Sequence, residues 1–179
     1  VGSYRREFIL PEDWKGRDIF LRFNGAGHGY YVWVNGKFVG YAEDSYLPSE
    51  FDITDKLHAG INNIAVRVYR FTTGSLLECQ DYWRLTGITR DVYLWSAPKT
   101  HIKDFFFRTT ELKAGNTSAE SAITVNIDGE KFKKVSLEAQ LLDGDRVLAT
   151  QTAEIIKSGE IELTFPTITG ITAWSAEMP

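Results

Sequence analysis

Cysteine, long apolar runs and an excess of positive charge are scarce or missing in this 179-residue chain. The single cysteine, Cys79, excludes an internal disulfide and a cysteine-based zinc site, and it is compatible with the cytoplasm or a bacterial periplasm. No apolar run approaches the ~20 residues that a membrane-spanning helix needs. The net charge of −4 argues against nucleic acid or an anionic membrane surface as the main partner.

Sequence motifs for familiar catalytic chemistry are also missing. The chain has no phosphate-binding loop, no Ser-His-Asp arrangement and no His/Cys set at metal-ligand spacing. Residues 1–3 lack the basic start and the apolar stretch of a signal peptide. With 43% hydrophobic and 25% charged residues the composition is that of an ordinary soluble globular protein, long enough for one large or two small domains.

The pattern that is present is apolar alternation, which predicts β-strands. We expect strands at 4–10, 18–23, 30–34, 37–42, 63–70 and 89–95, a short helical turn at 54–57, and no long amphipathic helix. Asn35-Gly36 joins two of these strands and is the favoured pair for a two-residue hairpin, because both positions need positive φ. Together these features predict an antiparallel jelly-roll β-sandwich.

The character of the chain changes after Pro98, where aromatic residues become rarer. Further strands are expected at 102–109, 121–128, 135–142, 146–154 and 161–165, with the sharpest turn at Asp143-Gly144-Asp145. This pattern predicts a second, smaller sandwich that resembles an immunoglobulin or fibronectin module. We expect an all-β fold with a jelly-roll domain at 1–98 and an immunoglobulin-like domain at 99–179.

The densest cluster of functional residue types is residues 80–92, QDYWRLTGITRDV. Carboxylates beside aromatic rings are typical of sugar sites, because carboxylates accept hydrogen bonds from hydroxyls and rings pack on the apolar face of a pyranose. Upstream lie residues 30–41, YYVWVNGKFVGY, and 44–53, DSYLPSEFDI. In this order and spacing, and starting from residues 1–8, VGSYRREF, these blocks resemble the sugar-binding domain of family-two β-galactosidases.

The resemblance implies a galactose-binding-like jelly roll followed by an immunoglobulin-like module, and it covers the first hundred residues best. It also implies a fragment of a longer enzyme, with the first strands of the jelly roll and the last strand of the second module outside the chain. Both catalytic glutamates of such enzymes, and their magnesium site, lie on a (β/α)₈ barrel that has no counterpart here. We therefore expect no catalytic residue and no cofactor in the fragment itself.

Asp81 is the first candidate site residue. By resemblance it contacts the galactose and helps to ligate a monovalent cation, usually sodium, in a site shared with the barrel. The alternative is that Asp81 forms an ion pair with Arg84 or Arg90 and fixes a loop. Trp83 is the aromatic residue expected nearest to the ligand, whereas Tyr31, Trp33 and Tyr82 are expected mainly in core or inter-domain packing.

The chain departs from the family at Gly27, where an asparagine or similar polar side chain usually contacts a sugar hydroxyl. Gly25, Gly27 and Gly29 are expected to leave this loop free to adopt positive φ. His28 could supply the lost contact from the next position, and the alternative is a solvated side chain. Cys79 is expected to be a small buried hydrophobe, and residues 116–118 fit a glycosylation acceptor, a triplet that is frequent by chance.

The main hypothesis is the non-catalytic N-terminal part of a retaining β-galactosidase, whose partners are a β-galactoside and the barrel of the parent. Family members often form dimers or tetramers. Three alternatives stay open: a stand-alone carbohydrate-binding module, a parent of β-glucuronidase or β-mannosidase type, and a purely structural sandwich pair.

Overall fold

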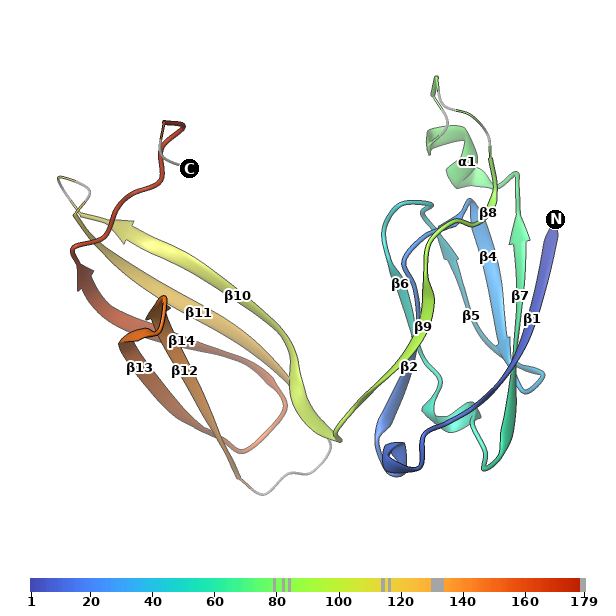
Figure 1. Cartoon of the computed structure of the whole chain (residues 1–179), viewed down its shortest axis with the longest axis horizontal. Helices are drawn as coiled ribbons and strands as arrows, with labels where there is room; N and C mark the ends of the chain where they lie inside the picture. The colour runs from blue at the N-terminus through green and yellow to red at the C-terminus, as the bar shows by residue number, and fades with distance from the viewer. Residues whose placement is uncertain are drawn as a thin grey trace. The chain divides into compact units, whose positions relative to one another are not determined.

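The computed structural model describes residues 1–78, 80–81, 83, 85–113, 115, 117–129 and 134–177. The predictions for Cys79, Tyr82, Arg84 and Asn116 lie outside these residues. The chain divides into two compact units, Val1–Pro98 and Lys99–Pro179, each built almost entirely from strands (Figure 1). This confirms the predicted all-β class. Within the described part of the chain no helix is long and apolar enough to cross a membrane.

The first unit contains a four-stranded sheet in the order β1-β7-β4-β5, a three-stranded sheet β6-β2-β9 and a short ladder β3-β8. The strands are β1 (Gly2–Ile9), β2 (Asp18–Phe23), β3 (Ala26–Gly27), β4 (Gly29–Val34), β5 (Lys37–Glu43), β6 (Ser49–Asp52), β7 (Ile61–Tyr69), β8 (Gly87–Ile88) and β9 (Val92–Ala97). Two 3-10 turns, η1 (Glu12–Trp14) and η2 (Thr54–Lys56), and the helix α1 (Thr73–Glu78) complete the unit.

The core of this unit lies between the two larger sheets, because alternate residues of β2, β4 and β7 point inward. Leu21, Phe23, Val32 and Val34 have no exposed surface, and they pack in one cluster. The valine face of β4 is therefore the core face, which the alternation by itself did not decide. Tyr31, on the opposite face of the same strand, is 37% exposed.

The hairpin between β4 and β5 confirms the prediction from Asn35-Gly36. Asn35 has φ 50° and Gly36 has φ 75°, as a type I′ turn requires. The Asn35 side chain also donates a hydrogen bond to Oδ1 of the buried Asn62 at 2.7 Å. This turn fixes the register in which Val34 pairs with Lys37.

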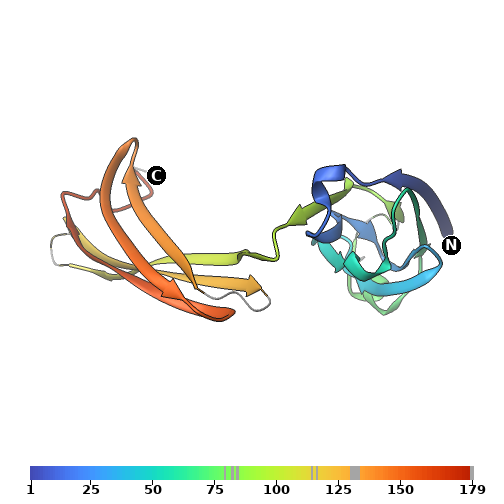
Figure 2. The same ribbon diagram turned by 90° about the horizontal axis from the view of Figure 1, so that it is seen from below.

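The second unit is a smaller sandwich, with a three-stranded sheet β10-β11-β14 and a two-stranded sheet β12-β13. Its strands are β10 (Thr100–Leu112), β11 (Ser118–Gly129), β12 (Val135–Asp143), β13 (Arg146–Ile155) and β14 (Gly159–Thr169). Leu137, Val125 and Phe165 belong to its buried cluster. The tight turn expected after Asp143 is present, with Gly144 at φ 58° and Asp143 paired with Arg146. Figure 2 shows the same elements from a second direction.

The short elements η1, β3, β6 and β8 were not predicted, and two further differences from the sequence-based expectation lie next to the candidate site. The strand predicted at 89–95 begins only at Val92, because Thr89 and Arg90 donate their backbone N–H groups to the carbonyl oxygen of Gly25 instead. Helix α1 was not predicted, since its six residues show too little periodicity to reveal it. These two segments flank the candidate sugar-binding residues.

Candidate functional site

The candidate site residues lie at the end of the first unit that carries α1 and the connection from α1 to β8 (Figure 1). Asp81 follows α1 by three residues, and both Asp81 and Trp83 are exposed. The loop that contains His28 reaches the same end through a hydrogen-bonded cluster with α1. The structure therefore brings the three predicted residues to one end, although the described contacts do not join them directly.

His28, Ser45 and Glu78 form a compact cluster that the sequence did not reveal. Nδ1 of His28 lies 2.9 Å from Oε2 of Glu78 and 3.1 Å from Oγ of Ser45. The Ser45 hydroxyl donates to Oε2 of Glu78 at 2.5 Å, and its backbone N–H donates to Oε1 at 3.1 Å. The partners are 50 and 33 residues apart in sequence, so no local pattern could have indicated them.

His28 is only 3% exposed, so the alternative of a solvated side chain is wrong. An ionised carboxylate only accepts hydrogen bonds, so the short contact with Glu78 places a proton on Nδ1 of His28. Burial acts to raise the pKa of Glu78, but hydrogen bonds from Ser45 and His28 outweigh it and hold the pKa below its ordinary value. The cluster thus stabilises an ionised Glu78 three residues before Asp81.

The three glycines around His28 are needed for close approach rather than for backbone freedom. None of Gly25, Gly27 and Gly29 has positive φ, which contradicts the expectation for this loop. A Cβ atom at Gly27 would lie 2.5 Å from Oγ of Ser45, and one at Gly29 would lie 2.7 Å from the Tyr41 hydroxyl. The family's usual polar side chain at position 27 therefore has no room beside Ser45.

The loop that contains Gly25, Gly27 and Gly29, called the glycine loop, also forms hydrogen bonds with the segment that follows Asp81. The carbonyl oxygen of Gly25 accepts hydrogen bonds from the backbone N–H of Thr89 at 3.1 Å and of Arg90 at 3.3 Å. The hydroxyl of Thr86 donates to the carbonyl oxygen of Gly27. Gly87, at φ 131°, pairs with Gly27 in the ladder between β3 and β8. Glu78 and β8, on either side of Asp81 and Trp83 in the sequence, are thus both held by contacts with this loop.

Asp81 forms no hydrogen bond or ion pair with any other described residue. The alternative in which it pairs with Arg90 is not observed: the Arg90 guanidinium donates to the backbone carbonyls of Tyr46 at 2.8 Å and Asn24 at 3.4 Å. Arg84, the other suggested partner, lies outside the described residues. An exposed carboxylate without such partners has unoccupied acceptor positions.

Large apolar side chains are exposed around Asp81. Trp83 is 81% exposed, which is the highest value among the exposed large hydrophobic residues of the described chain. Leu85, Leu76 and Leu77, on the same segment and on α1, are each at least 74% exposed. Further members lie in the adjoining loops at Tyr46, Leu47 and Phe71. A concentration of exposed apolar groups on a folded domain marks an interaction surface.

Tyr31 and Trp33 lie on the outer face of the four-stranded sheet rather than in the core. Tyr31 contacts Trp33, Phe38, Tyr41 and Tyr69, with ring centroids 4.6–6.2 Å apart. The prediction of core packing is therefore wrong for these two rings, because the inward positions of β4 belong to valine. Packing of the rings against another domain stays a prediction.

The chemistry that this arrangement permits is binding. Within the described residues no three His, Cys, Asp or Glu side chains gather in a way that could hold a metal ion. The Ser45, His28 and Glu78 side chains do not form a nucleophile triad, because Ser45 and Glu78 both contact the same ring nitrogen and bind each other. The site thus offers Asp81 as an acceptor and exposed rings as a packing surface.

The chain is similar to known proteins along its whole length. Curated relatives include the β-galactosidase of Streptococcus thermophilus, 40% identical over 182 residues, which cover all of this chain and 17% of that protein. The Clostridium acetobutylicum β-galactosidase is also 40% identical, over 20% of its length. In the β-galactosidase large subunit of Leuconostoc lactis the match is 39% identical and covers 28%. The chain thus spans about a fifth of the length of such relatives.

Solved structures share the fold. A Bacteroides uniformis β-glucuronidase superposes with a TM-score of 0.84 at 24% identity, over 98% of this chain and 22% of that one. A β-glycosidase from Bacteroides vulgatus gives a TM-score of 0.80 at 26% identity, over 98% and 22%. Residues 1–98 match the family described as glycosyl hydrolases family 2, sugar binding domain. The chain belongs to this family.

Proposed function

We propose that this chain is the non-catalytic portion of a retaining β-galactosidase and that it supplies part of the sugar subsite. The observation that carries the proposal is the 40% identity to β-galactosidases along the whole chain. Hydrolysis with retention requires two carboxyl groups ~5–5.5 Å apart, one as nucleophile and one as acid/base. In the proposed parent these groups belong to a (β/α)₈ barrel, so the 179 residues alone are inert.

Within that enzyme, Asp81 accepts hydrogen bonds from hydroxyls of the non-reducing galactose. Its exposure and its lack of partners among the described residues support this role. Trp83 and its apolar neighbours pack against the barrel or the sugar, which accounts for their exposure in the separate chain. His28 acts one step away from the sugar, because its buried ring holds Glu78 and thereby the start of the Asp81 segment.

A sodium ion is proposed at Asp81. A carboxylate oxygen suits a hard monovalent cation, and the side chain has acceptor positions to spare. In the proposed site Asp81 provides one ligand and the barrel of the parent provides the others. Sodium there would neutralise charge beside the bound sugar. In the proposed parent enzyme, magnesium is bound by the barrel alone.

The partners of the chain are then the catalytic barrel and a β-galactoside, and the parent assembles as a homo-oligomer. The exposed apolar residues near Asp81 support the contact with another domain. The immunoglobulin-like unit serves as a spacer that orients the jelly roll. The fold likeness to β-glucuronidases is at 24% identity and therefore carries no argument on the substrate.

A chimera tests this function. Residues 1–179 replace the matched segment of the Streptococcus thermophilus β-galactosidase, and hydrolysis of nitrophenyl β-galactoside and β-glucuronide is compared with that of the parent enzyme. The proposal predicts a folded chimera that hydrolyses the galactoside, whereas the chain alone does not. A folded but inactive chimera contradicts the proposed role, and a chimera that gains preference for the glucuronide favours the alternative parent.

A galactose titration of the separate chain, followed by amide NMR in sodium buffer, tests the stand-alone alternative. The proposal predicts a dispersed spectrum that does not move at millimolar sugar, because the subsite needs the barrel. Saturable shifts at Asp81, Trp83 and Gly25–Gly29 would instead show a carbohydrate-binding module that works by itself.

A further inference from the structure

Helix α1, which ends three residues before Asp81, buries a polar side chain instead of apolar ones. Of its six described residues only Ser75 is buried, whereas Leu76 and Leu77 are 74% and 75% exposed. A helix of this length is unstable by itself and ordinarily depends on an apolar face that packs on the core. The position of α1 in the fold therefore depends on hydrogen bonds with neighbouring segments.

Glu43, the last residue of β5, holds the start of α1. Its Oε2 accepts a hydrogen bond from the backbone N–H of Gly74 at 3.0 Å, and its Oε1 accepts one from the Tyr41 hydroxyl. The N–H of Gly74 belongs to the first turn of α1, where backbone donors have no partner within the helix. A Cβ atom at Gly74 would lie 3.1 Å from Oε2 of Glu43, so the glycine permits this approach.

Asp44 and Ser45 lead the chain from the start of α1 to its end. Asp44 has φ 112°, which is a strained conformation for a residue other than glycine, and its Oδ1 accepts the backbone N–H of Tyr46 at 3.0 Å. Ser45 then binds Glu78, the last residue of α1, through its hydroxyl and its backbone N–H. The three residues Glu43–Ser45 thus contact both ends of one short helix.

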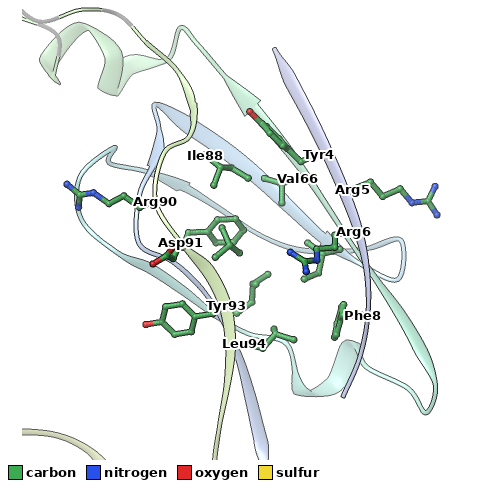
Figure 3. A pocket seen from close by; sticks show the side chains of 14 residues that line it. Tyr4, Arg5, Arg6, Phe8, Val66, Ile88, Arg90, Asp91, Tyr93 and Leu94 are labelled. Atoms are coloured by element: carbon green, nitrogen blue, oxygen red, sulfur yellow. The ribbon is translucent and has the colours of Figure 1, made fainter. Parts of the chain in front are cut away.

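Two further contacts hold this segment in place. Gly29 pairs with Glu43 in the ladder between β4 and β5, and a Cβ atom there would lie 2.7 Å from Cγ2 of Thr72, just before α1. The Arg90 guanidinium donates to the carbonyl oxygen of Tyr46 at 2.8 Å. In Figure 3 Arg90 lies at the edge of a pocket of about 700 Å³ between β1 and β9, and its side chain points away from β1.

We propose that Glu43 is a positioning residue for Asp81. Its hydrogen bond with Gly74 fixes the first turn of α1, and the contacts of Glu78 fix the end from which the chain continues to Asp81. A shift of α1 then displaces the carboxylate that binds the sugar, and a displacement of about 1 Å at a site can cost on the order of a hundredfold in rate. The inference rests on the proposed function, because it requires Asp81 to bind the galactoside.

This role depends on the reach of the Glu43 side chain and not on its charge. Glu43→Gln keeps an oxygen at the same distance from the backbone, and an amide oxygen can accept the Gly74 N–H. Glu43→Asp keeps the charge but is one methylene group shorter, so its oxygens no longer reach Gly74. If Glu43 acted on the ligand through its charge, Glu43→Gln would be the more damaging change.

The test measures kcat/KM for nitrophenyl β-galactoside in the chimera, with thermal melts of each variant. Glu43→Asp should lower kcat/KM about three- to tenfold, and Glu43→Gln should stay within about twofold of the unmodified chimera. In an Asp81→Ala background Glu43→Asp should have an effect of less than about twofold, because the positioned group is gone. Glu12→Ala, a change of another exposed glutamate, is the control and should leave kcat/KM unchanged.

Amide hydrogen exchange of the 179-residue chain provides a measurement that needs no activity. The amide of Gly74 should exchange several times faster in Glu43→Asp than in Glu43→Gln or the unmodified chain, because its acceptor is lost. Equal exchange in all three proteins overturns the inference, even where a variant of the chimera fails to fold.

The kinetic outcomes separate the inference from the proposed function. A loss of kcat/KM in Asp81→Ala without a loss in Glu43→Asp overturns the inference and leaves the proposed function intact. Equal losses from Glu43→Asp with and without Asp81 also overturn it, because the effect would then be one of stability alone. A larger loss in Glu43→Gln than in Glu43→Asp overturns it in favour of charge. Undiminished kcat/KM in Asp81→Ala overturns the proposed function and the inference together.

Discussion

Nδ1 of His28 lies 2.9 Å from Oε2 of Glu78, and this contact ties the glycine loop to the last residue of α1. Ser45 completes the cluster through its hydroxyl and its backbone N–H. Three separate chain segments thereby meet beside the Asp81 segment. The contact explains how short, irregular loops can hold a fixed geometry at this end of the sandwich.

Glu78→Gln should destabilise the first unit by about 1.5–3 kcal/mol at neutral pH, because charged hydrogen bonds inside the cluster are lost. The pKa of Glu78 is lowered in the folded state, so its contribution is fully present above the ordinary value of 4.5. That contribution is lost as the pH falls through the lower, folded pKa. Urea melts from neutral to acidic pH should therefore show that the free energies of unfolding of the wild type and of Glu78→Gln approach each other as the pH falls.

Asp55→Asn provides the control, because this exposed carboxylate contacts Lys56 and takes no part in the cluster. A gap between wild type and Glu78→Gln that stays constant down to acidic pH would contradict the assigned ionisation of Glu78.

Gly27→Ala should destabilise the chain by about 1–3 kcal/mol, because the new Cβ atom would lie 2.5 Å from Oγ of Ser45. The same substitution in a Ser45→Gly background should cost clearly less, since the clashing atoms are gone. Thermal melts of the four proteins in this cycle measure the coupling. Equal costs of Gly27→Ala in both backgrounds would show that Ser45 does not exclude a side chain at position 27.

Trp83→Ala should leave the stability of the separate chain within about 0.5 kcal/mol, because the ring is 81% exposed. In the chimera the same change should lower activity or thermal stability, since the ring is proposed to be buried against another domain or the sugar. Trp174→Ala is the control, with a tryptophan that is 75% exposed in the other unit. If Trp83→Ala changed neither the activity nor the thermal stability of the chimera, Trp83 would not belong to the proposed interface.

Replacing sodium by choline in the assay of the chimera should raise KM for the galactoside, because the ion is proposed to sit beside the sugar at Asp81. The Asp81→Ala chimera should show little further response to the ion. Initial rates at constant ionic strength measure both effects. An undiminished sodium response in Asp81→Ala would place the ion elsewhere.

The strands could be predicted because apolar alternation and the turn preferences of hairpins are visible in residues that are neighbours in the sequence. Residues 18–23 were predicted with their observed bounds, and Asn35-Gly36 fixed its turn through backbone preference alone. The site was less accessible to sequence reasoning. Contacts between His28 and Glu78 span 50 residues, and the steric need for Gly27 depends on Ser45 brought close by the fold. Glycine spacing could not distinguish close approach from positive φ.

The central claim is that Asp81 completes a galactoside subsite in a longer enzyme, and Asp81→Ala in the chimera tests it most directly. Loss of a charged hydrogen bond worth about 1.5–3 kcal/mol should lower kcat/KM for nitrophenyl β-galactoside by roughly 10- to 150-fold. Asp55→Ala should leave it unchanged, because that side chain contacts Lys56 instead. A folded Asp81→Ala chimera with undiminished kcat/KM would contradict the account.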